Sequence, residues 1–274
     1  MSKRATNEGG AYAVEVRGLT KVFWDESRGE VRAVDGIDFE AGTGEILGLL
    51  GANGAGKTTT LRVLATILKP TGGTARIMGH DVVEAPEAVR LNLGFYSAST
   101  ALYPRLTAKE TLEFFARVNR YPSDRVRARV DDLIERFGMT EYQNARVEKI
   151  SSGMKQKVSI ARTVAHDPPV LIFDEPTVGL DVINAIEMQQ VIRQLKEDGK
   201  CILFSTHIMS EAEKLCDRIA IIHRGRILDL GSLAELRERT GKHYLEDIFI
   251  HYVQGMIDLE LPEAGSGVAL EERP

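Results

Sequence analysis

Gly51-Ala-Asn-Gly-Ala-Gly-Lys-Thr-Thr59 is the stretch that decides the fold. The apolar run 44–50 directly before it is short, as expected of a strand that is buried on both faces. After it, apolar residues recur at helical spacing, at Leu61, Leu64, Ala65 and Leu68, until the breaker residues 70–73. The glycine-rich segment is therefore predicted to connect a buried strand to a helix.

In that context the pattern G-x-x-x-x-G-K-T predicts a phosphate-binding loop. Glycines let backbone N–H groups turn toward phosphate oxygens, and the helix N-terminus adds its partial positive charge. We expect Lys57 to pair with the β- and γ-phosphates and Thr58 to place its hydroxyl on Mg²⁺. The predicted nucleotide-binding residues are Gly51, Ala52, Asn53, Gly54, Ala55, Gly56, Lys57, Thr58 and Thr59. The alternative is a glycine-rich turn before an ordinary helix.

Two acidic residues follow a second apolar run. Val170-Leu-Ile-Phe173 predicts a buried strand that ends in Asp174 and Glu175, before Pro176. Ligands of open parallel sheets bind at this carboxyl edge. Asp174 suits a metal-holding role because Mg²⁺ takes oxygen ligands, and Glu175 is the candidate that orients or deprotonates the attacking water. Without the phosphate loop, a solvated acidic turn would be the preferred interpretation.

A second exposed helix N-terminus is predicted at Ser151-Ser-Gly-Met-Lys-Gln156. The apolar positions after it share one face: Val158, Ala161, Val164 and Ala165. A single nucleotide needs only one such terminus. Taken alone, the motif would be interpreted as an ordinary serine N-cap.

Together and in this order, the motifs resemble the ATP-binding cassette family. The resemblance implies that Ser151 and Gly153 face the γ-phosphate of ATP held by an opposing cassette. Ser152 stands where the family usually has its first signature glycine, and Met154 where it often has glutamine. We therefore expect a working but altered contact.

The resemblance covers nearly the whole chain. It implies an α/β fold, with a P-loop NTPase core of mostly parallel sheet, an antiparallel β edge and an inserted helical subdomain. The expected parts are an ATP-binding domain at 14–246 with the helical subdomain at about 93–150, a flexible N-terminus at 1–13 and a partly disordered C-terminal extension at 247–274. A capping box at Thr107-Ala-Lys-Glu110 predicts the first helix of the subdomain.

Three further site residues come from the resemblance. His207 matches the switch histidine that reads the γ-phosphate, a task that suits an imidazole at a strand end. Asp181 ends a segment that is similar to the one crossing the interface between cassettes. Phe23 fits the aromatic position that stacks on adenine, and its neighbour Trp24 could substitute for it. Either ring could instead cover the core.

One position departs from the family pattern. Ala98 stands where the family has a glutamine that contacts Mg²⁺ and the lytic water, and alanine has no group that coordinates. Ser97 and Ser99 flank it with hydroxyls that reach less far. The departure implies slow hydrolysis or an altered link to the transport partner.

Composition agrees with a cytoplasmic ATPase. The chain has 274 residues, 43% of them hydrophobic, enough to bury a large core. Two cysteines, Cys201 and Cys216, argue against a disulfide framework. No apolar run reaches the roughly eighteen residues that span a bilayer. The net charge of -5 gives no general attraction to nucleic acid, so no nucleic-acid partner is expected.

Short stretches narrow the subtype. Segments 97–100 and 245–249, with the signature variant, are similar to ATPase subunits of bacterial exporters, most of all the sodium-extruding, NatA-type group. The resemblance implies an ATP hydrolase that uses ATP and Mg²⁺, forms an ATP-dependent homodimer or heterodimer of cassettes, and lies on the inner face of the cell membrane through a separate integral membrane permease.

The cargo stays open at this stage. None of these residues forms a sodium site, so Na⁺ efflux stands beside export of a drug, lipid or polysaccharide. Two other classes are alternatives: a soluble cassette protein acting on nucleic acid or ribosomes, and a regulator that only binds nucleotide.

Overall fold

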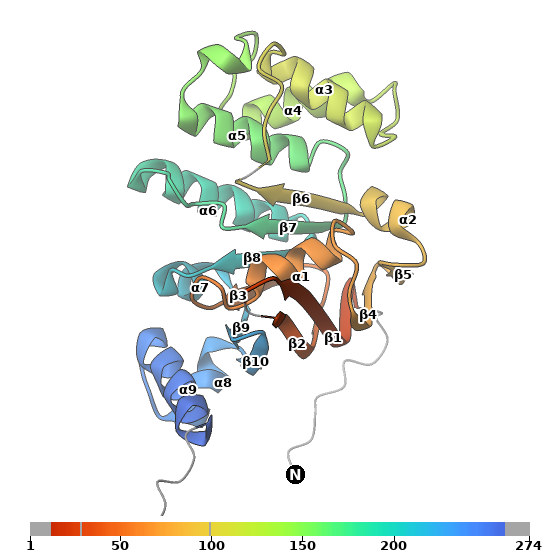
Figure 1. The fold of residues 1–274 in the computed structure, drawn as a ribbon. Helices are drawn as coiled ribbons and strands as arrows, with labels where there is room; N and C mark the ends of the chain where they lie inside the picture. Colours follow the sequence, from red (N-terminus) through yellow and green to blue (C-terminus); the bar gives the residue numbers. More distant parts are fainter. Residues whose placement is uncertain (1–11, 28, 99, 261–274) are drawn as a thin grey trace, which may run out of the picture.

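A six-stranded sheet forms the centre of the computed structural model, which describes residues 12–27, 29–98 and 100–260 (Figure 1). The strand order is β10-β9-β3-β8-β7-β6. The strands are β3 (Ile46–Leu50), β6 (Leu93–Ser97), β7 (Val170–Asp174), β8 (Cys201–Thr206), β9 (Arg218–His223) and β10 (Arg226–Gly231). Neighbours are parallel except in the hairpin of β9 and β10. The predicted mostly parallel sheet is confirmed.

A second, antiparallel sheet supplies the predicted β edge. Its order is β2-β1-β4-β5, with β1 (Val14–Asp25), β2 (Gly29–Ala41), β4 (Gly72–Ile77) and β5 (His80–Asp81). Helix α1 (Lys57–Leu64) contributes Leu61 and Leu64 to the apolar core that both sheets share. The phosphate-loop helix is thereby fixed between the two sheets.

Each central strand fills two separate cores, because successive side chains of a strand point to opposite faces. In β7, Val170 and Ile172 join the core shared with the antiparallel sheet. Leu171 and Phe173 join a second core with the helices on the other face. Burial on both faces explains why the strand sequences are continuously apolar rather than alternating.

Helices cover the second face and form the inserted subdomain at the top of Figure 1. They are α3 (Ala108–Val118), α4 (Val126–Arg136), α5 (Ser152–Thr163) and α6 (Val182–Glu197), with a short 3₁₀ turn at Val147–Lys149. Helix α2 (Pro86–Leu91) instead packs through Val89 on the core shared with the antiparallel sheet. The capping box is confirmed. The Thr107 hydroxyl accepts from the Glu110 N–H at 3.1 Å, and the Glu110 carboxylate accepts from the Thr107 N–H at 2.8 Å.

Helix α1 is shorter than its apolar spacing predicts, since it ends at Leu64 rather than near Leu68. The backbone at Thr66 has a φ of 60°, which a right-handed helix does not allow. Leu68 nevertheless packs on the core from the turn that follows. A residue at helical spacing can thus pack on the same core although its backbone lies outside the helix.

The structure describes part of each expected chain-end segment. Ala13, expected in a flexible N-terminus, is buried, and its N–H donates to Ala41 O at 3.0 Å. The limit at 246 falls inside α9 (Leu245–Glu260), which packs on α7 (Met209–Leu215) and α8 (Leu233–Thr240). The expectations for 1–11 and 261–274 lie outside the described residues. No helix in the described ranges could cross a membrane.

His166, in the turn between α5 and β7, gives the fold a measurable pH dependence. Burial lowers the pKa of its imidazole from 6.5 to about 4. The unfolded chain therefore takes up this proton first as the pH falls, so the contribution of His166 is complete above about 6.5 and is lost toward about 4.

We expect the free energy of unfolding to fall with pH across this window by no more than about 3 kcal/mol from this residue. Denaturant unfolding at a series of pH values gives the free energy of unfolding as a function of pH. Between pH 6.5 and 5, above the range of most carboxylates, this dependence should be flatter for His166→Gln than for the parent protein. The exposed His243→Gln is the matched control and should keep the parent slope. Equal slopes in all three proteins would contradict the assignment.

Candidate functional site

Strand register brings the predicted motifs to one edge of the parallel sheet. Leu50 of β3 lies beside Thr206 of β8, and Asp174 of β7 lies beside Ser205 of β8. The residues that follow these strand ends are Gly51, Glu175 and His207. Segments more than a hundred residues apart in sequence therefore meet at the carboxyl edge, where open parallel sheets bind ligands.

The glycine-rich loop is packed too tightly for side chains at two of its glycines. A Cβ atom on Gly51 would lie 2.3 Å from the carbonyl oxygen of Ile222. Gly56 has a φ of 107°, and a Cβ there would lie 2.4 Å from Ala33 O. Helix α1 begins at Lys57, and its N-cap residue, Gly56, has no side chain to cap it, so the first N–H groups of the helix are available to an anion.

A buried ammonium group and an imidazole converge on one carboxylate oxygen. Lys57 is only 4% exposed, and its Nζ donates to Gly51 O at 2.6 Å and Ala52 O at 3.2 Å. The same Nζ lies 3.4 Å from Glu175 Oε1, and His207 Nδ1 lies 3.3 Å from that oxygen. A buried charge is costly unless paired, so these partners hold Lys57 in place.

Asp174 is buried among hydroxyl groups rather than paired with a basic residue. Its Oδ1 accepts from Thr58 Oγ1 at 3.0 Å and from Ser205 Oγ at 2.7 Å. A carboxylate and a hydroxyl at this spacing are hard oxygen donors, the kind of ligand that Mg²⁺ takes, so these two residues would suit it. The two residues predicted for the metal are therefore side by side.

Ser205 connects the two acids and was not predicted from the sequence. Its hydroxyl donates to Asp174 and accepts from the Glu175 N–H at 3.0 Å. That bond helps hold Glu175 at a φ of 51°, a conformation that L-residues rarely adopt. The sequence did offer a signal for it, because the polar residues Ser205 and Thr206 directly follow the apolar run 201–204.

A buried carboxylate fixes the residues on either side of His207. The Thr206 hydroxyl donates to Glu211 Oε2 at 2.8 Å and accepts from the Ile208 N–H at 2.9 Å. Glu211 is buried on α7, and nothing in the sequence pattern distinguished it from an ordinary helical acid. The histidine is thus carried by a short, hydrogen-bonded turn.

The signature residues lie beside a second helix terminus. Ser151 caps α5 by accepting from the Met154 N–H at 3.3 Å, and a Cβ atom added at Gly153 would lie 3.6 Å from Asn184 Nδ2. Asp181 caps α6 by accepting from the Asn184 N–H at 3.0 Å. That hydrogen bond lowers the pKa of Asp181 and keeps its carboxylate ionised. Ser151, Gly153 and Asp181 therefore share one surface.

The two aromatic side chains proposed to stack on adenine lie at the surface. Phe23 and Trp24 are both exposed on β1, with Lys21 Nζ 5.0 Å from the centre of the Phe23 ring.

A hydrogen bond links the signature helix to the segment after Glu175. Gln156 of α5 donates to the carbonyl oxygen of Pro176. This last contact was not foreseen, because it joins residues whose helix and loop meet only in three dimensions.

Residues 34–178 match the model of the family described as ABC transporter. The chain belongs to the ATP-binding cassette family. It is an ATP-binding, ATP-hydrolysing subunit of a transporter. The ABC transporter ATP-binding protein NatA of Bacillus subtilis is 43% identical over 80% of this chain and 90% of its own length.

Other relatives carry names from resistance and export. The daunorubicin/doxorubicin resistance ATP-binding protein DrrA of Streptomyces peucetius is 37% identical, over 94% of this chain and 77% of its own. Nod factor export ATP-binding protein I of Paraburkholderia xenovorans is 40% identical, over 77% of this chain and 69% of its own.

Solved structures give the same fold. An ATP-binding subunit of an ABC transporter superposes with a TM-score of 0.80 at 29% identity, over 88% of this chain and 99% of that one. A dimeric, post-hydrolysis cassette bound to ADP and Pi gives a TM-score of 0.72 at 25% identity, over 80% of this chain and 98% of that one.

Removing the Ser205 hydroxyl should uncouple the two acids from each other. A hydrogen bond to a charged group is worth about 1.5–3 kcal/mol, so we expect Ser205→Ala to lower the ATP hydrolysis rate about tenfold or more. The KM for ATP should change less, because the glycine loop is untouched. Steady-state phosphate release measures both, with the exposed Ser210→Ala of α7 as control. A parent-like rate in Ser205→Ala would contradict this role.

Proposed function

We propose that the edge containing Lys57 and Glu175 binds ATP and hydrolyses it. The loop from Gly51 to Thr59 encloses the β- and γ-phosphates, with Lys57 as the cation that neutralises them. Thr58 and Asp174 would hold Mg²⁺, which would supply positive charge beside the phosphates. The observation that carries this proposal is the convergence of Lys57 and His207 on Glu175 Oε1, at 3.4 and 3.3 Å.

Glu175 is the residue we assign to the attacking water. Its side chain is partly exposed at the strand end, so a water can reach it, while its backbone is anchored by Ser205. His207, on the neighbouring strand end, contacts the γ-phosphate. Phosphoryl transfer requires positioning and charge stabilisation more than covalent help, and this arrangement supplies both.

The signature surface completes a site on a second cassette, in a homodimer or heterodimer. Ser151, Gly153 and Asp181 lie together on exposed helix termini, and similar cassettes have been solved as dimers. ATP then joins the glycine loop of one cassette to Ser151 of the other. Loss of the γ-phosphate removes contacts from both sides, so the pair opens after hydrolysis.

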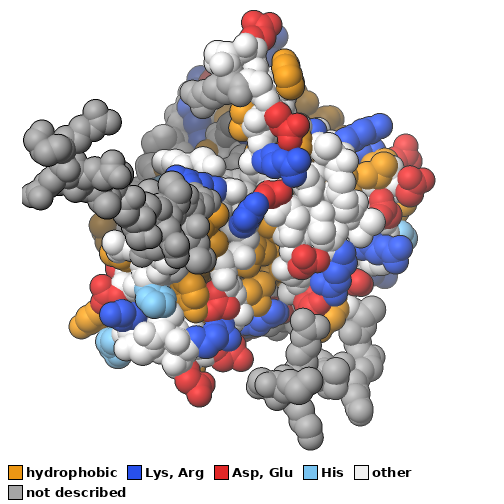
Figure 2. Space-filling view, turned by 60° about the horizontal axis from the view of Figure 1, so that its bottom comes forward, with side chains coloured by type: hydrophobic (Ala, Val, Ile, Leu, Met, Phe, Trp, Pro, Cys, Tyr) orange, Lys and Arg blue, Asp and Glu red, His pale blue; other side chains and the backbone are white. Residues whose placement is uncertain are grey.

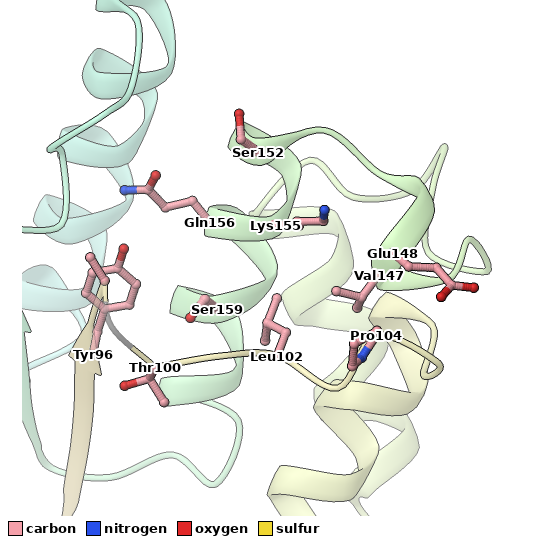
Figure 3. A pocket seen from close by; sticks show the side chains of 11 residues that line it. Tyr96, Thr100, Leu102, Pro104, Val147, Glu148, Ser152, Lys155, Gln156 and Ser159 are labelled. Atoms are coloured by element: carbon pink, nitrogen blue, oxygen red, sulfur yellow. The ribbon is translucent and has the colours of Figure 1, made fainter.

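The permease contacts the inserted subdomain in this proposal. A cleft of about 540 Å³ lies between the loop after β6 and the exposed face of α5. In Figure 3, Thr100, Leu102 and Pro104 form one wall, and Lys155 and Ser159 of α5 form another. Ala98 lines the same cleft, so the position that departs from the family pattern lies at the proposed route between nucleotide and permease. Ser99 lies outside the described residues.

Glu175→Gln separates binding from hydrolysis. The amide cannot take a proton from water, so the rate should fall at least about a hundredfold while ATP binding is retained. Phosphate release and the affinity for a fluorescent ATP analogue are the two measurements, with the exposed Glu197→Gln of α6 as control. Hydrolysis that survives in Glu175→Gln would remove this residue from its assigned role.

Na⁺ efflux is the first candidate cargo, on the resemblance to sodium-extruding cassettes. Drug export is the second, and it is favoured by the match of the drug-resistance protein DrrA to 94% of this chain. A nucleic-acid partner has less support, because Lys and Arg are interspersed with Asp and Glu on the face shown in Figure 2.

The cargo is tested with the chain and the membrane protein that co-purifies with it, reconstituted together in vesicles. We expect Mg²⁺- and ATP-dependent movement of ²²Na⁺ that Glu175→Gln abolishes. Movement of daunorubicin without ²²Na⁺ would replace the first candidate by the second. Co-purification of ribosomes or nucleic acid in place of a membrane protein would overturn both.

A further inference from the structure

Four large apolar side chains are exposed together where the chain leaves the catalytic edge. Val178, Val182, Ile183 and Ile186 are 43, 75, 72 and 50% exposed, and we call them the α6 patch. Val182 and Ile186 are four residues apart on α6, and Ile183 and Ile186 are three apart, so they share one face of the helix. Exposed apolar residues gathered on one face mark an interaction surface more often than scattered ones do.

The α6 patch is continuous with the signature surface. Asp181 directly precedes Val182. Asn184, between Ile183 and Ile186, is the side chain that a Cβ atom added at Gly153 of the signature would meet first, at 3.6 Å. Lys157 of α5 also pairs with Glu187 of α6 at 2.6 Å, which ties the two helices together. In Figure 1 both helices begin on the side where β7 ends. A partner that reaches Ser151 therefore also approaches these isoleucines.

The cleft assigned to the permease lies on another side of α5. Ser152, Lys155, Gln156 and Ser159 of α5 line that cleft. Lys157, by contrast, points to α6. The permease contact and the α6 patch therefore use different faces of the signature helix, which leaves the opposing cassette as the occupant that fits the patch.

We propose that the α6 patch packs against a second copy of this chain and strengthens the ATP-bound pair through apolar contact. The inference rests on the proposed function, because it extends the nucleotide-joined interface beyond the groups that touch ATP. Burial of two isoleucines on each copy lowers the free energy of the closed pair in proportion to the area removed from water. Formation of the pair then depends on the α6 patch as well as on ATP.

The test uses the full chain with Glu175→Gln as the parent, since it retains ATP. Sedimentation velocity in Mg²⁺-ATP gives the dissociation constant of the pair. We expect Ile183→Ser/Ile186→Ser, added to the parent, to raise that constant at least about tenfold. Ile183→Leu/Ile186→Leu should restore it. The control Val118→Ser removes a similarly exposed side chain, 59% exposed on α3, and should leave it unchanged.

The outcomes are distinguishable. At a protein concentration low enough to keep both proteins monomeric, a fluorescent ATP analogue should bind the serine variant with parent affinity, which shows that the fold and the glycine loop are intact. If the parent dimerises in Mg²⁺-ATP and the serine variant dimerises equally well, the role of the α6 patch is overturned and the proposed function stands. A parent that stays monomeric in Mg²⁺-ATP overturns the proposed pairing and the patch with it.

Discussion

Parallel hydrogen bonding between β3, β8 and β7 is the constraint on which the site depends. The pairs Leu50 with Thr206 and Asp174 with Ser205 put three strand ends at one level. A slip of one residue would turn every side chain of a strand to the opposite face and remove it from its core. Because each strand is packed on both faces, the register is fixed by the same apolar residues that fold the domain. The positions of Lys57, Glu175 and His207 follow from it.

Charge and hydroxyl groups are divided between the two acids at this edge. Glu175 lies beside the Lys57 ammonium and the His207 imidazole, whereas Asp174 accepts hydrogen bonds from the Thr58 and Ser205 hydroxyls. An acid without a basic partner keeps its oxygens for a cation, and an acid beside a basic side chain can exchange that contact when phosphate arrives. Adjacent residues thus have different chemical surroundings, and the Ser205 hydroxyl keeps both in place.

The chain presents three distinct surfaces around one helix. The N-terminus of α5 carries Ser151, its cleft face leads past Ala98 to the inserted subdomain, and its other side is joined to α6 by Lys157 and Glu187. Gln156 binds the carbonyl of Pro176, one residue after Glu175. The signature helix is therefore in direct contact with the segment that follows Glu175.

The sequence by itself determined the features that depend on neighbours along the chain. The glycine loop, the acids after β7, the Ser151 cap and the Thr107 capping box follow from spacing and local hydrogen bonding, which a few consecutive residues specify. Tertiary structure alone decided where α1 ends, that α9 continues past residue 246, and that Ser205 and Glu211 support the site. These depend on contacts between residues distant in sequence, and such contacts arise only when the sheet register is set and water is excluded from the core.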